Sequence, residues 1–186
     1  MNKLTNRVLL QNIPILINDN IMYNNRLTVN KYSYKEPLKK EPLNKELLYN
    51  NYINNSFNKD AIINICKNEI IDWKKYVWFD KNKYVKSLVY NNNIYDMYII
   101  SWNDNQISQI HDHPENGCIM KILDGSIEEV LYDNKLNVIE QTEYNKGDIS
   151  YIDNNRGFHK MKTTSKCVTL HIYSPPNYKL NIYKEL

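Results

Sequence analysis

Glycine and cysteine are scarce in this chain, which holds four glycines and three cysteines in 186 residues. The cysteines, at positions 66, 118 and 167, are odd in number and lack the spacing of a disulfide framework. A disulfide scaffold is therefore not expected, and a reducing compartment such as the cytoplasm is predicted. A domain of about 150 residues or more buries roughly 70% of the surface that its unfolded chain exposes, so one hydrophobic core suffices without disulfides.

Long apolar runs and an excess of one charge are also absent. No window of about 18 apolar residues occurs, so we expect a soluble protein without a membrane-spanning helix. The net charge is only +3, with 24 basic and 21 acidic residues mixed along the chain. This mixture lacks the basic stripe of a nucleic-acid binder. We therefore expect a small-molecule partner, no nucleic acid, no membrane, and a monomer.

The N-terminal part gives little periodic signal. Residues 1–40 are rich in asparagine and have no clear period, which favours an extended leader before a single domain at 41–186. The first acidic residue is Asp19, and Lys3 and Arg7 precede it. This acidic-poor start leaves an organelle transit peptide as an alternative to a cytoplasmic protein.

Helical spacing is confined to about 41–80. Apolar residues at helical spacing predict a short helix over Leu43–Tyr52 and a second over Lys59–Ile70. Cys66 lies on the apolar stripe of the second, where a small core residue is expected. Asp72 is positioned to cap a third, short helix that holds Trp73 and Tyr76.

From about residue 83 onward the period changes from helical to two. The runs Tyr84–Tyr90 and Ile94–Trp102 flank three asparagines, which tolerate the left-handed conformations of tight turns, so a hairpin is predicted. Many short strands at near-regular spacing indicate a mainly β fold, a sandwich or small barrel over about 83–186. The further predicted strands are Ser108–His113, Cys118–Leu123, Ser126–Tyr132, Val138–Tyr144, Ile149–Ile152, Phe158–Thr163, Val168–Tyr173 and Tyr178–Tyr183.

All four histidines, at positions 111, 113, 159 and 171, and all four glycines lie between residues 110 and 171. Side chains two apart on a strand point to the same face, so His111 and His113 project together as ligands suited to a first-row transition metal. His159 follows 46 residues after His113, a separation that adjacent hairpins of a barrel can close. The alternative for the His-x-His pair is a chance surface pair.

The stretch Ile110–Gly125 resembles the first motif of the cupin family, in which a His-x-His pair is followed by a glutamate and later by a glycine. Here Cys118 occupies the glutamate position, and Gly125 occupies the glycine position of the motif. The second motif, Gly147–His159, departs by a two-residue insertion and lacks the family's proline. These departures leave three imidazoles as the expected ligands. Such a set keeps the full dipositive charge on the metal and leaves coordination positions open.

A closer resemblance is to the cysteine dioxygenase family, the thiol dioxygenase branch of the cupins. It covers about residues 72–176 and rests on Ile110–Cys118, Gly157–His159 and Thr169–Pro176. It implies a cupin-type barrel with short N-terminal helices. It also implies non-haem iron(II) held by the three histidines of the two motifs, His111, His113 and His159. The implied reaction is oxidation of a cysteine thiol by dioxygen to the sulfinic acid, a step in cysteine catabolism and taurine biosynthesis.

Further roles follow from the same segments. Thr169, His171 and Tyr173 alternate on one strand face, so they can form a relay in which the hydroxyl orients the imidazole and the imidazole orients the phenol. The resemblance implies a thioether between Cys118 and Tyr173, for which a buried free cysteine is the alternative. It also implies a cis peptide bond before Pro175.

One position departs from the family in a way that concerns the substrate. Where the family has Tyr-x-Arg, this chain has Tyr84 and Lys86, and lysine keeps the charge without the bidentate fork that grips a carboxylate. Lys86 is the candidate substrate ligand, with a solvated strand lysine as its alternative, and Arg156 is a second candidate fork.

Three functions therefore remain open from the sequence alone. The first is an iron-dependent dioxygenase of L-cysteine, which the presence of Cys118 and Tyr173 favours. The second is a dioxygenase of another small thiol, 3-mercaptopropionate or cysteamine, which is suggested by Lys86 at the position of the family's arginine. The third is a metal-binding cupin module without turnover. Iron content and thiol-dependent oxygen uptake distinguish the enzymes from the module.

Overall fold

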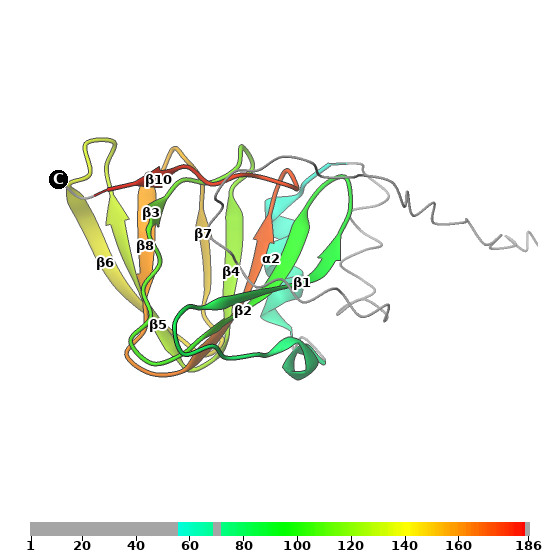
Figure 1. Cartoon of the computed structure of the whole chain (residues 1–186). Helices are drawn as coiled ribbons and strands as arrows, with labels where there is room; N and C mark the ends of the chain where they lie inside the picture. Colours follow the sequence, from blue (N-terminus) through cyan, green and yellow to red (C-terminus); the bar gives the residue numbers. More distant parts are fainter. Residues whose placement is uncertain (1–55, 69–71, 185–186) are drawn as a thin grey trace, which may run out of the picture. The chain divides into compact units, whose positions relative to one another are not determined.

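Two antiparallel β-sheets and a helix packed against one of them make up the described part of the chain (Figure 1). The computed structural model describes residues 56–68 and 72–184, all within one unit of residues 32–186. The helices are α2 (Lys59–Lys67) and the 3-10 helix η1 (Trp73–Tyr76). The strands are β1 (Val85–Asn91), β2 (Asp96–Trp102), β3 (Ile110–His111), β4 (Cys118–Asp124), β5 (Ser126–Tyr132), β6 (Val138–Asn145), β7 (Ile149–Ile152), β8 (Phe158–Lys162), β9 (Cys167–Tyr173) and β10 (Ile182–Tyr183).

The predicted mainly β fold is confirmed. One sheet has the strand order β1-β2-β9-β4-β7, and the other has the order β10-β3-β8-β5-β6. The predicted hairpin joins β1 and β2, with Asn91 opposite Asp96. Its turn is closed by the side chain of Asn92, whose Oδ1 accepts hydrogen bonds from the backbone N–H groups of Ile94 and Tyr95, each at 2.8 Å. An asparagine side chain that satisfies nearby backbone donors stabilises such a turn locally.

Helix α2 begins where the sequence predicts. The side chain of Asn58 accepts a hydrogen bond from the backbone N–H of Ala61 at 3.0 Å and so caps the first turn. The apolar stripe of the helix buries Ile62, Ile65 and Cys66. The helix ends at Lys67, before the predicted end at Ile70, which lies outside the described residues. The predicted helix over residues 43–52 and the proposed leader over residues 1–40 also lie outside them.

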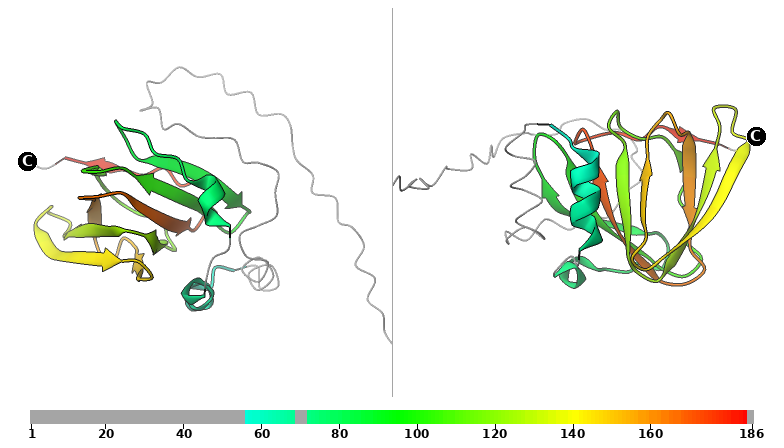
Figure 2. Two further views of the ribbon diagram at one scale, coloured as in Figure 1. Left: turned by 90° about the horizontal axis from the view of Figure 1, so that it is seen from below. Right: turned by 180° about the vertical axis from the view of Figure 1, so that it is seen from behind.

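The outer face of the first sheet receives this helix, as the right panel of Figure 2 shows from behind. Ile119 and Leu123 of β4 belong to the same buried cluster as the apolar stripe of α2. Between them, the buried Lys121 donates from Nζ to the backbone carbonyls of Cys66 and Asn68 at the end of the helix. Carbonyls at the C-terminal end of a helix lack intrahelical donors, so the lysine satisfies them and ties the helix to the sheet.

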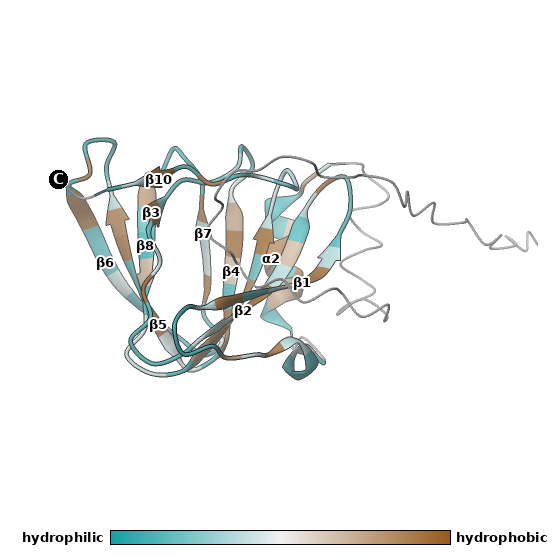
Figure 3. Cartoon of the chain, in the orientation of Figure 1, coloured by the Kyte–Doolittle hydropathy of each residue, from teal (hydrophilic) through white to brown (hydrophobic). Residues whose placement is uncertain are grey.

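The alternation of strand side chains separates this helix-packed face from the face that looks toward the second sheet. Along β9, Leu170 and Ile172 pack into the cluster with α2. His171 and Tyr173, which alternate with them along the strand, point the other way. Figure 3 shows apolar colours along β4 and more hydrophilic colours along β6. No helix among the described residues has both the length and the apolar character to cross a membrane.

Three local expectations need correction. Asp72 has a left-handed backbone, with φ of 69°, and makes no side-chain cap to η1; its carboxylate pairs with Lys75 Nζ at 3.0 Å instead. The predicted strand over 108–113 is only two residues long, Ile110–His111, because pairing with β8 is limited to the His111 position. The last predicted strand, over 178–183, likewise shortens to Ile182–Tyr183, which pairs with β3 alone. The expected cis peptide bond between Ser174 and Pro175 is confirmed.

Candidate metal centre

Three histidines converge in the space between the sheets. His111 at the end of β3 lies directly opposite His159 of β8. His113 lies beyond the end of β3, so the prediction that it shares one strand face with His111 is wrong. Its position is fixed by Asn154, which accepts a hydrogen bond from the His113 N–H at 2.9 Å and donates one to the His113 carbonyl at 2.7 Å. The predicted convergence itself is confirmed.

The three imidazoles are buried and close enough to share one ion. Their potential ligand atoms all lie within 4.8 Å of one another. The ring centroids of His111 and His159 are 4.6 Å apart, and those of His113 and His159 are 4.5 Å apart. Imidazole nitrogen suits zinc, copper, iron and nickel, so the geometry describes a transition-metal site.

The hydrogen bonds of two of these rings determine which nitrogen faces the centre. His111 Nδ1 is 2.8 Å from the backbone carbonyl of Gln109, and His159 Nδ1 is 2.6 Å from Oε1 of Glu129. Both partners accept hydrogen bonds, so each Nδ1 carries the proton and each Nε2 keeps its lone pair. These two Nε2 atoms face each other at 3.1 Å. Two lone pairs at this distance need a cation between them, and the donor set therefore fits a metal ion.

Burial also keeps these rings neutral, which metal binding requires. Burial lowers the pKa of His111 to about 4. It lowers the pKa of His113 and of His159 well below 6.5, and the neighbouring imidazoles add to the effect. Among the described residues, the buried Nδ1 of His113 has no hydrogen-bond partner. Leaving a buried polar atom unsatisfied costs about 1–3 kcal/mol, a cost that a functional site tolerates more readily than a plain core does.

The predicted relay forms beside the three histidines. Nε2 of His171 is 2.9 Å from the hydroxyl of Thr169, and its Nδ1 is 3.3 Å from the phenol oxygen of Tyr173. Sequence reasoning missed a fourth member, Trp102, whose Nε1 donates to the Thr169 hydroxyl at 3.0 Å. Because an indole N–H can only donate, it occupies one lone pair of this hydroxyl and leaves the other side facing His171.

Cys118 lies against the same relay. It occupies the position directly opposite Tyr173 in the pairing of β4 with β9, and its Sγ is 3.7 Å from His171 Nδ1. Burial raises the pKa of the Cys118 thiol to about 12 and raises that of the Tyr173 phenol well above 10. Both groups are therefore protonated at neutral pH in this environment.

A small pocket lies beside the relay, and two of the predicted substrate-binding residues, Tyr84 and Lys86, line it together with His171 and Tyr173. Its lining residues are Tyr84, Lys86, Ile100, Trp102, Ser108, His111, Met161, His171, Tyr173 and Leu180. Lys86 Nζ lies 4.6 Å from the ring centroids of both Tyr98 and Tyr173. Burial lowers the pKa of this half-buried lysine to about 8, although Cys118 and Asp96 act in the opposite direction. The half-buried Lys86 therefore places its ammonium beside the relay.

Arg156, the other candidate for the substrate, is placed differently. Its Nη1 donates to the carbonyl of Tyr151 at 3.0 Å, and its Nη2 lies 3.4 Å from Glu140 and 3.6 Å from Glu129. It is not among the described residues that line the pocket of Lys86. The guanidinium is thus engaged by carboxylates behind His159.

Glu129 is the main functional candidate that the sequence analysis missed. It lies on β5 between Ile127 and Leu131, which belong to the buried clusters between the sheets. Only 1% of its side chain is exposed. A carboxylate in the middle of an inward-facing apolar row is the signal that could have identified it, because such a charge must find partners to remain buried.

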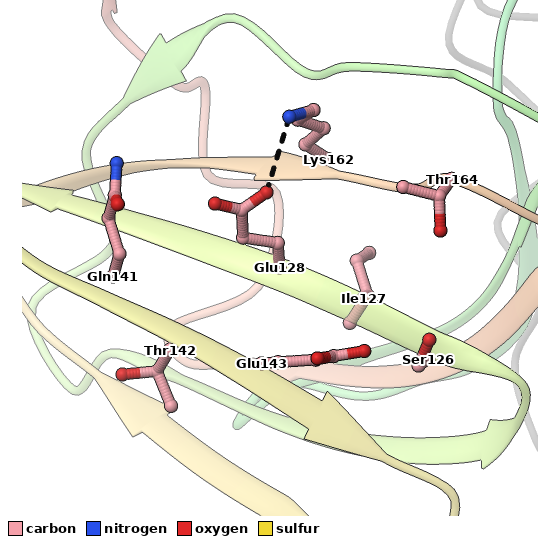
Figure 4. Close-up of a pocket in the computed structure, with 8 residues that line it drawn as sticks. All are labelled: Ser126, Ile127, Glu128, Gln141, Thr142, Glu143, Lys162 and Thr164. Atoms are coloured by element: carbon pink, nitrogen blue, oxygen red, sulfur yellow. Dashed lines mark ion pairs between the residues drawn. The ribbon is translucent and has the colours of Figure 1, made fainter.

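A larger surface pocket of about 280 Å³ lies elsewhere, across β5, β6 and the end of β8 (Figure 4). Its polar lining includes the ion pair of Glu128 with Lys162, at 3.4 Å. None of the four histidines lines it. The smaller pocket beside the histidines is therefore the better candidate site, because the groups that carry chemistry line that pocket.

Comparison with known proteins agrees with this geometry. Residues 30–186 match the family model of cysteine dioxygenase type I. The chain is 31% identical to cysteine dioxygenase type 1 of Homo sapiens over 126 residues, which cover 62% of this chain and 63% of the human protein. The corresponding protein of Rattus norvegicus is 29% identical over the same shares. These alignments thus span less than two thirds of the relatives' length.

A solved structure supports the fold alone. It is a double-stranded β-helix protein of Klebsiella pneumoniae, with a TM-score of 0.54 at 16% identity, and the match covers 63% of this chain and 93% of that one. The family model covers most of this chain and includes every residue of the site described above. The chain belongs to the cysteine dioxygenase type I family.

Proposed function

We propose that this protein is a non-haem iron thiol dioxygenase that oxidises L-cysteine to cysteine sulfinic acid. In this reaction both atoms of one dioxygen molecule add to the thiol sulfur, so that R–SH and O₂ give R–SO₂H. The observation that carries the proposal is that three neutral imidazoles converge beside a hydroxyl–imidazole–phenol relay, and that one pocket, lined by His111, His171, Tyr173 and the half-buried Lys86, reaches both groups.

The metal site would be formed by His111, His113 and His159. Bound ferrous iron would supply the redox chemistry that lets dioxygen react with a thiolate. The protein's own contribution is to keep all three rings neutral by burial. The Gln109 carbonyl and the Glu129 carboxylate orient the rings of His111 and His159, and the Asn154 amide fixes the backbone of His113. Three neutral ligands preserve the positive charge that attracts an anionic thiolate.

Lys86 would hold the carboxylate of the substrate. Its ammonium reaches the same pocket as Tyr173 and His171, and a charged hydrogen bond contributes about 1.5–3 kcal/mol. Tyr84 supports this wall of the pocket by packing against Trp102, with ring centroids 4.4 Å apart. The protonated phenol of Tyr173 would donate a hydrogen bond into the pocket, while His171 and Thr169 hold its orientation.

Lys86 also fits a second class of substrate, small thiols other than cysteine. A single ammonium aligns a carboxylate less strictly than a guanidinium fork does. The same chemistry therefore admits 3-mercaptopropionate, and cysteamine if the carboxylate contributes little. We favour cysteine because Cys118 and Tyr173 are both present and lie directly opposite each other. We extend the proposal to a monomer in the cytoplasm, a reducing compartment in which cysteines remain free, as the three buried cysteines of the described residues are.

Oxygen uptake by the purified, iron-loaded protein tests the proposal. We expect uptake with L-cysteine that exceeds uptake with 3-mercaptopropionate or cysteamine, together with cysteine sulfinic acid as the product. His159→Ala is the matched control and should show none. Iron binding without uptake on any of the three thiols would identify a metal-binding module and refute the enzyme.

A thioether between Cys118 and Tyr173 is part of the same proposal. Its formation breaks the S–H bond and one ring C–H bond and joins Sγ to the phenol ring, and the two protons and two electrons released are accepted by dioxygen during turnover. Intact mass after many turnovers should reveal a fraction of molecules lighter by two hydrogens. Cys118→Ser should lack this fraction. An unchanged mass of the original protein after turnover would show that the bond does not form.

A further inference from the structure

Glu129 makes the shortest hydrogen bond to any of the three ligand histidines. Its Oε1 is 2.6 Å from His159 Nδ1, compared with 2.8 Å between His111 Nδ1 and the carbonyl of Gln109. The third ring, His113, has no partner at Nδ1 among the described residues. Of the three ligands, His159 is therefore the one whose hydrogen-bond acceptor at Nδ1 carries a charge.

The other oxygen of this carboxylate is also held. The phenol of Tyr144 donates to Glu129 Oε2 at 3.1 Å, and Arg156 Nη2 lies 3.6 Å from the same oxygen. Arg156 is itself anchored by the carbonyl of Tyr151 and by Glu140. A chain of contacts thus runs from a metal ligand, through one buried carboxylate, to a half-buried guanidinium.

We propose that Glu129 is a positioning residue that tunes the bound metal through His159, with Arg156 as its counter-ion. The inference rests on the metal site of the proposed function and assigns Arg156 a role away from the substrate. The carboxylate accepts the Nδ1 proton, directs Nε2 toward the metal and makes the ring a stronger donor. Partners of this kind affect metal affinity by about 10- to 100-fold.

The two charges act on the metal in opposite directions. Negative charge near His159 stabilises the more oxidised metal, so Glu129 lowers the reduction potential of the bound iron. Arg156 offsets part of that charge and therefore raises the potential. A residue that merely supports the fold would not give effects of opposite sign, so this pair of effects distinguishes tuning from packing.

Glu129→Gln tests the first half, because glutamine keeps the shape and an accepting oxygen but removes the charge. Iron(II) affinity is measured anaerobically by competition with a chelator, and the potential is measured by redox titration of the iron-loaded protein. We expect an affinity about 10- to 100-fold weaker and a higher potential. Glu128→Gln is the matched control: Glu128 neighbours Glu129 on β5 but pairs with Lys162 on the opposite face, so both values should stay at those of the original protein.

Arg156→Gln tests whether Arg156 raises the potential. It also provides a separate test of the inference if Glu129→Gln does not fold. It leaves Glu129 in place without its counter-ion, so the potential should fall below that of the original protein. If both variants keep the original potential and affinity, Glu129 is a packing residue and the inference is wrong. These readouts involve neither thiol nor dioxygen. The inference can therefore stand if thiol oxidation is absent, and fail if thiol oxidation is present.

Discussion

His159 and His171 are two buried histidines of one site with different partners. The Nδ1 atom of His159 faces a carboxylate, that of Glu129. The two nitrogens of His171 face the hydroxyl of Thr169 and the phenol of Tyr173. Burial lowers the pKa of both rings well below 6.5. The two rings therefore share a neutral charge state and differ in what holds them.

These partners show how one fold gives two imidazoles distinct tasks. A carboxylate only accepts, so it fixes the proton on Nδ1 and presents the Nε2 lone pair of His159 to a metal. Hydroxyl groups both donate and accept, so they leave the proton of His171 free to occupy either nitrogen. The first arrangement suits a ligand, and the second suits a residue that orients or passes a proton.

Removal of each ring should give the largest contrast. We expect His159→Ala to lose bound iron and all oxygen uptake, because two imidazoles hold the metal poorly. His171→Ala should keep its iron and lose roughly 100- to 10,000-fold in rate, the range of a lost acid–base group. Iron content and oxygen uptake of both purified variants measure this. Equal iron loss in the two variants would mean that the two rings do not differ in task.

Lys86 lies on the relay side of the site, so its removal should affect substrate binding and not metal binding. Lys86→Ala should raise KM for L-cysteine about tenfold to a hundredfold, the effect of one charged hydrogen bond of about 1.5–3 kcal/mol. KM for cysteamine, which lacks a carboxylate, should change little. Lys86→Arg should lower KM for cysteine, because a fork binds a carboxylate better. An unchanged KM for cysteine in Lys86→Ala would place the carboxylate elsewhere.

The pH dependence of KM gives a second test of Lys86. Burial lowers the pKa of Lys86 to about 8. The side chain is therefore positively charged below that pH and loses its charge as the pH rises through it. KM for cysteine should therefore rise above about pH 8, by roughly tenfold for each further pH unit. Titration of the substrate affects all variants alike. Lys86→Arg, whose guanidinium stays charged, should lack the additional rise, and parallel profiles of the two proteins would refute the assignment.

Trp102→Phe should give the smallest effect and tests whether the relay has a preferred proton position. The indole N–H donates to the Thr169 hydroxyl at 3.0 Å, and its loss removes a bond of about 0.5–1.5 kcal/mol, or roughly twofold to tenfold in equilibrium. Nitrogen NMR of labelled histidine should show a change in the proton distribution between Nδ1 and Nε2 of His171. The signals of His159 are the internal control. A shift of His159 and not His171 would contradict the distinction.

Local sequence patterns predicted much of the fold. Alternating apolar residues indicated most strands, including β5 over Ser126–Tyr132 and β7 over Ile149–Ile152 with correct bounds. The spacing within strands also placed Thr169, His171 and Tyr173 on one face. These successes share a cause: strand side chains alternate with a period of two, so neighbours along the chain determine which residues share a face. The division into a leader and a domain at residue 40 stays a prediction.

Contacts between segments far apart in sequence could not be predicted in the same way. The sequence predicts His113 within a strand, but the residue lies beyond the end of β3, where Asn154, 41 residues away, positions it. Glu129 meets His159 across the pairing of β5 with β8, and Trp102 meets Thr169 across the pairing of β2 with β9. The order of residues along the chain sets which side chains are available and which face of each strand they occupy. The partner that each buried nitrogen meets depends on the tertiary structure, because strand order and register bring distant partners together.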